Sequence, residues 1–343
     1  MDHSSSFNQG GAATTIGAVH TDVIESHVLT KFDGASLACA ASASHMLRNL
    51  CNKENLWRDI CDLTWDSIKH PLVRKTISTF PGGYRSFFSD AFPVIRPDQT
   101  KRTQGTPFSE GDMPELISAV DIHYGDELIF SKVVVTNTGD KSFRHFSFWV
   151  DMLENKETVK IPLKFESDED KCILLELQEN LKLSWIVIDP TRKRAVNVSS
   201  FGPVSVQPYW NGYDIQVIFA TILSGDNSSE LVECRIVATF GCKEGKYVKF
   251  RELNMYMEDM HMRRLSGEKS LKILEEAMER GERKKANGGE MKETYEKYLE
   301  LKRKKIEGKK RTERTLNMVY RLSWVAYFFA FVFLIVSLNV FPN

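Results

Sequence analysis

The chain has 343 residues, and its 46 Lys and Arg residues balance its 46 Asp and Glu residues, so the formal net charge is zero. This balance excludes a general electrostatic attraction to nucleic acid, and no nucleic-acid partner is expected. A hydrophobic content of 42% is typical of globular protein and suffices for two modest domains. The N-terminus lacks the basic and apolar regions of a secretory signal, so we expect the bulk of the chain in the cytosol.

The first part of the chain predicts a disordered tail followed by a small helical module. Residues 1–18 are rich in Ser, Gly, Ala and Thr and lack periodic apolar positions, which is typical of disorder. Residues 19–65 have apolar residues at helical spacing and a break at Asp33-Gly34, which together predict three short helices. Helices this short bury a shared core only by packing on one another or on a partner.

The middle of the chain predicts a linker and then a β-rich domain. Residues 66–115 contain most of the prolines and the pair Gly82-Gly83, which favours a linker with some short structure. Residues 116–285 consist of short β-branched and aromatic runs separated by turns, and they end in a helix with an apolar stripe. This pattern predicts an antiparallel, sandwich-like domain, and with the flanking helices the fold class is α+β.

The C-terminal region predicts a charged helical stalk at 286–321 and a transmembrane helix at 322–341. The second segment has about twenty residues without a charge, enough to cross a bilayer. A buried core helix and an amphipathic hairpin are the alternatives. By the positive-inside rule, basic residues before this segment place the N-terminal region in the cytosol. These flanking residues are Lys304, Lys305, Lys309, Lys310, Arg311, Arg314 and Arg321.

The predicted location follows from this segment. We expect a tail-anchored, single-pass membrane protein of the endoplasmic reticulum or nuclear envelope, with the lipid bilayer as a partner. The same basic cluster is also typical of a nuclear localisation signal, which would place the protein in the nucleus instead.

No catalytic or metal-binding motif is evident in the sequence. There is no phosphate-binding loop, dinucleotide fingerprint, H-E-x-x-H motif or G-x-S-x-G motif. The six cysteines form no C-x-x-C pair, which predicts reduced, buried thiols rather than zinc ligands. We therefore expect no cofactor, no metal and no catalytic residue. Trp185, Tyr209 and Trp210 could line a ligand pocket, with packing in the core or in a turn as the alternative.

Residues 22–65 resemble an F-box. The matching parts are Val28-Leu29 ahead of Phe32-Asp33, Leu37 at the start of the second helix, and the closing stretch LWRDIC at 56–61. The remainder resembles a group of plant F-box proteins that includes the cytokinin-induced type, some of which end in a transmembrane helix. The matching stretches are 130–133, 184–190, 194–200, 203–206, 219–221, 231–234, 257–260 and 265–271.

This resemblance implies a substrate-recognition subunit of a Skp–cullin–F-box E3 ubiquitin ligase, which holds a target protein near the conjugating enzyme for ubiquitination and degradation. The implied partners are a Skp-type adaptor, a cullin and an unidentified protein substrate, and the implied role is a non-enzymatic one. Apolar F-box positions are implied in adaptor contact, with the module's own core as the alternative for each. They are Ile24, Val28, Leu29, Phe32, Leu37, Leu56, Trp57 and Ile60.

Two other functions fit the same sequence. The usual Leu-Pro opening of an F-box is absent, with His20-Thr21 in its place, which suggests a membrane scaffold that does not engage a cullin ligase. The aromatic turns of the β-rich domain suggest a lectin-like or small-ligand module. Pull-down of the adaptor separates the first alternative from the ligase hypothesis.

Overall fold

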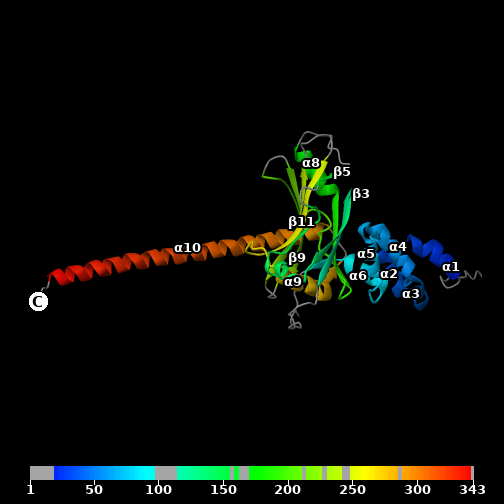
Figure 1. Ribbon diagram of the computed structural model, residues 1–343, viewed down its shortest axis with the longest axis horizontal. Helices are drawn as coiled ribbons and strands as arrows, with labels where there is room; N and C mark the ends of the chain where they lie inside the picture. The colour runs from blue at the N-terminus through cyan, green and yellow to red at the C-terminus, as the bar shows by residue number, and fades with distance from the viewer. Residues whose placement is uncertain are drawn as a thin grey trace, which may run out of the picture. The chain divides into compact units, whose positions relative to one another are not determined.

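The computed structural model describes residues 19–96, 114–154, 158–161, 170–210, 214–225, 230–241, 248–284 and 288–340. The chain forms two compact units, unit 1 up to Ser89 and unit 2 from Asp90 onward. The described part of unit 1 is helical, whereas unit 2 contains two β-sheets and several helices (Figure 1). The fold is therefore α+β, as the sequence predicts. The predicted disordered tail at 1–18 lies outside the described residues.

Unit 1 is a series of short helices whose starts are fixed by polar caps. Its elements are α1 (Thr21–Val23), the π-helical η2 (Ile24–Val28), the 3-10 helix η3 (Leu29–Lys31), α2 (Gly34–Ala43), α3 (His45–Cys51), α4 (Glu54–Thr64), η4 (Ser67–Lys69), α5 (Pro71–Ile77) and α6 (Gly83–Ala91). The Asp33 carboxylate accepts the Ser36 N–H at the start of α2, and the Ser44 hydroxyl accepts the Leu47 N–H at the start of α3. Pro71 occupies the first turn of α5.

Aromatic side chains fill the core of unit 1. The ring centroids of Trp57 and Phe88 are 5.4 Å apart, and those of Trp65 and Phe87 are 5.8 Å apart. Helix α2 begins directly against this cluster, because a Cβ atom at Gly34 would lie 2.2 Å from the Phe88 ring. The elements η4, α5 and α6 come from the stretch predicted as a linker with short structure, and they supply several of these rings.

The first sheet of unit 2 has the strand order β12-β1-β7-β6-β2-β3. Its strands are β1 (Val94–Arg96), β2 (Glu115–Tyr124), β3 (Glu127–Asn137), β6 (Leu181–Asp189), β7 (Arg194–Asn197) and β12 (Glu282–Lys284). All its neighbouring strands are antiparallel except β1 and β7, which are parallel. The short strand β1 lies within the predicted linker, so the sheet includes residues that precede the predicted β-rich domain.

The second sheet has the order β4-β11-β10-β9-β8, and β5 pairs with β11 as well. Its strands are β4 (Trp149–Asp151), β5 (Val159–Ile161), β8 (Ser205–Pro208), β9 (Asp214–Ser224), β10 (Leu231–Gly241) and β11 (Val248–Asp259). The three long strands are paired antiparallel over most of their length. Every described pair in this sheet is antiparallel, which is typical of a sandwich.

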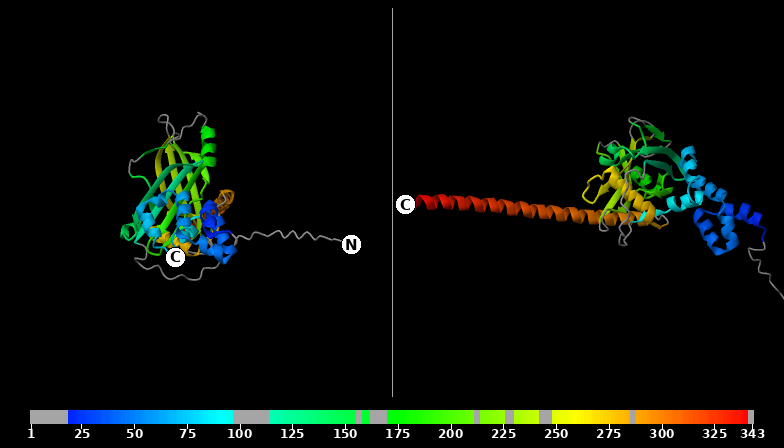
Figure 2. Two further views of the ribbon diagram at one scale, coloured as in Figure 1. Left: turned by 90° about the vertical axis from the view of Figure 1, so that its right-hand side faces the viewer. Right: turned by 60° about the horizontal axis from the view of Figure 1, so that its bottom comes forward.

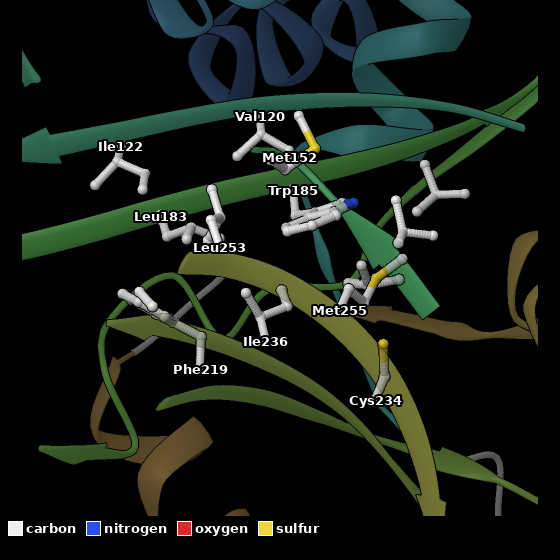
Figure 3. Close-up of a cluster of buried hydrophobic side chains, with 14 of the residues drawn as sticks. Val120, Ile122, Met152, Leu183, Trp185, Phe219, Cys234, Ile236, Leu253 and Met255 are labelled. Atoms are coloured by element: carbon white, nitrogen blue, oxygen red, sulfur yellow. The ribbon is translucent and has the colours of Figure 1, made fainter. Parts of the chain in front are cut away.

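One apolar core lies between the two sheets. Figure 3 shows side chains of both sheets pointing toward one another across this layer. The first sheet contributes Val120, Ile122, Leu183 and Trp185, and the second contributes Phe219, Cys234, Ile236, Leu253 and Met255. Trp185 is fully enclosed, and its indole N–H donates to the Ser118 hydroxyl at 3.2 Å, so its polar atom is satisfied.

Helices cover parts of this sandwich. Besides the short α7 (Lys141–His145), α8 (Asp170–Asn180) contacts β2 and β6 of the first sheet and β8 of the second, and lies alongside the strands (Figure 2). Helix α9 (Gly267–Arg280) starts at Ser266, whose hydroxyl accepts the Lys269 N–H. Its apolar stripe, which includes Leu271, Leu274 and Met278, joins the core of the sandwich.

The long helix α10 (Gly288–Val340) packs on the second sheet through its first turns. Tyr295 and Tyr298 are buried against Ile218 and Ile222 of β9 and against Met260. The sequence predicts an exposed stalk here, because charged residues dominate its composition. The spacing of the two tyrosines nevertheless gives the helix one apolar face, and that face is buried.

The prediction of a transmembrane helix at 322–341 is wrong. Within the part of the chain that the structure describes, no helix is both long enough and apolar enough to span a bilayer. The predicted single-pass membrane location rested on this segment and is overturned with it.

Candidate functional site on the N-terminal helices

Five of the eight predicted adaptor-contact residues form the core of unit 1. Ile24, Leu29, Leu37, Leu56 and Trp57 are all nearly inaccessible to solvent. The indole N–H of Trp57 donates to a backbone carbonyl oxygen of α3 at 2.7 Å, so this side chain is fixed inside the unit. These five residues therefore hold the helices together in the chain by itself.

The other three predicted residues reach the surface. Val28 is 38% exposed, and Phe32 and Ile60 are half-buried. Val28 ends the π-helical segment η2, and Phe32 follows the short helix η3. These side chains are free to contact a partner without rearrangement of the core.

Four exposed large apolar residues of unit 1 were not predicted from the sequence; Val19 and Leu72 lie outside residues 22–65, and the other two lie within that stretch. Leu63 on α4 is 88% exposed, and Val23 at the end of α1 is 47% exposed. Leu56, Ile60 and Leu63 recur at steps of four and three residues, so the helical period of α4 could have identified Leu63. We call Val23, Val28, Phe32, Ile60 and Leu63 the apolar surface set.

The π-helical turn explains why two valines face outward together. The Leu29 N–H donates to the Ile24 carbonyl oxygen, five residues earlier, which defines the wider turn. Residues five apart therefore share a side: Ile24 and Leu29 point into the core, and Val23 and Val28 point to solvent. In an α-helix with 3.6 residues per turn, residues five apart would lie on different faces, so neither the two core residues nor the two valines would share a side.

Two of the three thiols of this unit are buried and unreactive; Cys39 on α2 is exposed, so the expectation of buried cysteines is wrong at this position. Cys51 and Cys61 are buried, and burial raises the pKa of each thiol above its ordinary value. A raised pKa keeps the sulfur protonated and unreactive at neutral pH. Burial acts in the same way on Cys234 in the core of unit 2.

The predicted residues outside unit 1 have varied surroundings. Trp185 belongs to the sandwich core, so it cannot line a ligand pocket. Trp210, at the β8–β9 turn, is 86% exposed, and Tyr209 beside it is half-buried. All seven basic residues predicted to flank a membrane span lie exposed on α10; Lys304 pairs with Glu300, and Lys309 with Glu313.

These features define a class of protein: a small helical module with apolar residues on its surface, followed in the chain by a β-sandwich that encloses its own core. The sequence is 40% identical over 325 residues to the probable F-box protein At2g36090 of Arabidopsis thaliana, covering 93% of each chain. It is 39% identical to the F-box protein At3g44326 of the same plant, covering 92% of this chain and 88% of the relative. The identity to F-box protein At2g27310 is 34%, covering 93% and 97%.

The chain belongs to the F-box proteins. The predicted resemblance to plant F-box proteins is thereby confirmed, whereas the relatives' names say nothing of cytokinin or of a membrane anchor. No protein-family model matches the sequence, and no solved structure matches the chain.

Proposed function

We propose that the protein is a substrate-recognition subunit of a Skp–cullin–F-box E3 ubiquitin ligase. Unit 1 binds the Skp-type adaptor, which links it to the cullin, and unit 2 binds the target protein. The chain supplies no catalytic group in this role. It accelerates ubiquitination by holding the target near the charged conjugating enzyme, which converts an encounter in solution into a local one.

The apolar surface set is the observation that supports adaptor binding by unit 1. Its five residues lie within 23–63, at the helices that resemble an F-box. Exposed apolar side chains on a small helical unit gain free energy when a partner removes them from water. The core residues of the unit stay in place during this step, because they are already packed on one another.

The first test changes Leu63, the most exposed member of the set. Leu63→Asp should leave the thermal stability of the protein unchanged, since the side chain is in solvent. A charge buried in the interface should weaken adaptor binding by about tenfold or more. Calorimetric titration of the full chain with a purified Skp-type adaptor measures this loss.

The matched control is Leu72→Asp on α5, an exposed leucine outside the apolar surface set. This variant should bind the adaptor as tightly as the wild type. Equal affinity of Leu63→Asp and wild type would contradict the proposed contact. No measurable adaptor binding by the folded wild type would favour a scaffold that does not engage a cullin ligase.

A further inference from the structure

The guanidinium of Arg264 lies over two aromatic rings on unit 2. Its central carbon is 4.6 Å from the centroid of the Trp149 ring and 4.6 Å from that of the Tyr256 ring. The two rings are parallel within 1°, with centroids 5.4 Å apart. We call Trp149 and Tyr256 the aromatic platform. A cation held over ring faces at this distance is attracted by their negative electrostatic potential.

The sheet fixes the geometry of the platform. Trp149 on β4 and Tyr256 on β11 are direct cross-strand partners, so their side chains rise from the same face of the sheet. Both rings are half-buried, which leaves part of each accessible to a ligand. β4 is the edge strand of its sheet, so the platform lies at the border of the sandwich.

Arg264 is held differently from the arginine beside it. Arg263 forms an ion pair with Asp259 at 2.8 Å, and its backbone N–H also donates to that carboxylate. Within the described part of the chain, no carboxylate lies at salt-bridge distance from the Arg264 guanidinium, which lies over the two rings. Its side chain is exposed. A cation–π contact at an exposed site is weak, so the guanidinium can exchange with another cation.

We propose that the aromatic platform binds an arginine or lysine side chain of the ubiquitination target, and that Arg264 occupies the site in the unbound protein. Binding of the cation itself depends on the platform alone, whereas the identity of the partner as a target rests on the proposed ligase function. The target then displaces Arg264 and replaces its contact. This predicts that the recognised surface of the target is basic.

The test uses the full chain with Arg264→Ala, which empties the platform. N-acetyl-arginine amide should cause a saturable shift of the Trp149 indole N–H signal in nuclear magnetic resonance spectra. Its affinity for the variant should exceed that for the wild type by about two- to fivefold, the factor that corresponds to an exposed cation–π contact. N-acetyl-lysine amide with a free ammonium group should bind as well, which would show that the positive charge is recognised.

N-acetyl-citrulline amide is the matched ligand control, because it has the shape of arginine without the charge. The proposal is overturned if the citrulline compound binds as tightly as the arginine compound. It is also overturned if neither the arginine nor the lysine compound shifts the Trp149 signal. In a Tyr256→Leu/Arg264→Ala protein with an unchanged melting temperature, the Trp149 shift should be lost; a retained shift of equal size would also count against the platform. Adaptor titration of Arg264→Ala should match the wild type, so failure here is distinct from failure of the ligase function.

Discussion

The two units bury their apolar residues in different ways. Unit 2 encloses a continuous core between two sheets, and large side chains such as Trp185 and Phe219 are fully covered. Unit 1 has helices of at most 11 residues and leaves Leu63, Val23 and Val28 in solvent although its centre is closed. Both units have a packed interior, and unit 2 also leaves apolar side chains in solvent, among them Phe146, Leu175 and Trp210, but these three lie outside its strands.

This difference indicates how the work is divided along the chain. A sandwich whose core is completed by its own two sheets can vary its loops and edges for recognition without losing its fold. A helical unit with an apolar surface gains stability when a partner covers it. We therefore expect damage to the core of unit 2 to leave adaptor binding intact, and damage to the surface of unit 1 to leave folding intact.

The largest expected effect comes from Trp185→Ala. Removing this enclosed ring leaves a cavity between the sheets and should lower the free energy of unfolding of unit 2 by about 4–5 kcal/mol. Urea unfolding followed by far-ultraviolet circular dichroism measures the loss. Under conditions in which unit 2 stays folded, adaptor affinity should equal that of the wild type. A parallel loss of affinity would contradict the division of roles between the two units.

A smaller effect is expected at the contact between α10 and the second sheet. Lys302 donates to Glu258 at 2.6 Å and to the fully buried Glu233 at 3.3 Å, and the Tyr295 hydroxyl donates to Glu233 as well. Lys302→Met removes the ammonium partner of the buried Glu233 carboxylate, which keeps the Arg235 guanidinium at 3.7 Å, so the loss should be about 2 kcal/mol. Helix α10 should then detach and become sensitive to limited proteolysis.

Lys304→Met is the matched control for this contact. Lys304 is exposed and pairs with Glu300 one turn away, so its loss should change stability by less than about 0.5 kcal/mol. Equal protease sensitivity of Lys302→Met and Lys304→Met would show that the buried ion pair does not hold α10 on the sheet.

The smallest effect is expected at Asp259, which shapes the turn before Arg264. Burial alone would raise the pKa of Asp259, but backbone and side-chain donors of Arg263 and the His261 N–H outweigh it and lower the pKa. A lowered pKa means that the stabilisation is present above the unfolded pKa of about 3.9 and is lost as the pH falls through the folded value. Asp259→Asn should therefore lose less stability than the wild type between about pH 4 and pH 2.

Chemical unfolding at a series of pH values measures this difference, which should stay below about 1 kcal/mol for a single turn carboxylate. Asp126→Asn provides the control, because that carboxylate is fully exposed and lies 3.6 Å from the Lys182 ammonium group. An identical acid response of wild type and Asp259→Asn would contradict the role of this turn.

Sequence patterns predicted the elements that repeat over many residues. Alternating and β-branched runs predicted the long strands β9, β10 and β11, and a regular apolar stripe predicted α9. The three-residue strand β1 could not be predicted, because its pairing with β7 and β12 joins residues far apart in the chain. Short strands have too few residues to show a period.

The candidate site was predicted as a group of apolar positions but not sorted into core and surface. Leu56 and Leu63 are seven residues apart on one face of α4, yet only Leu56 is covered. Burial depends on which element lies above each residue, and a single sequence does not contain that information. The wider π-helical turn of η2 likewise depends on packing that helical periodicity does not predict.

The antiparallel pairing of β1 with β12 has a practical consequence for dissecting the protein. Val94 lies opposite Lys284, so the first strand of the sandwich, β1, pairs directly with its last strand, β12, which precedes α10. The carboxylate of Asp90, just upstream, forms ion pairs with Arg194 Nε at 2.9 Å and with Arg283 Nη2 at 3.4 Å. A fragment cut at residue 116 would expose the edge of β7 and release both arginines from their carboxylate, so an autonomous sandwich has to begin no later than Asp90.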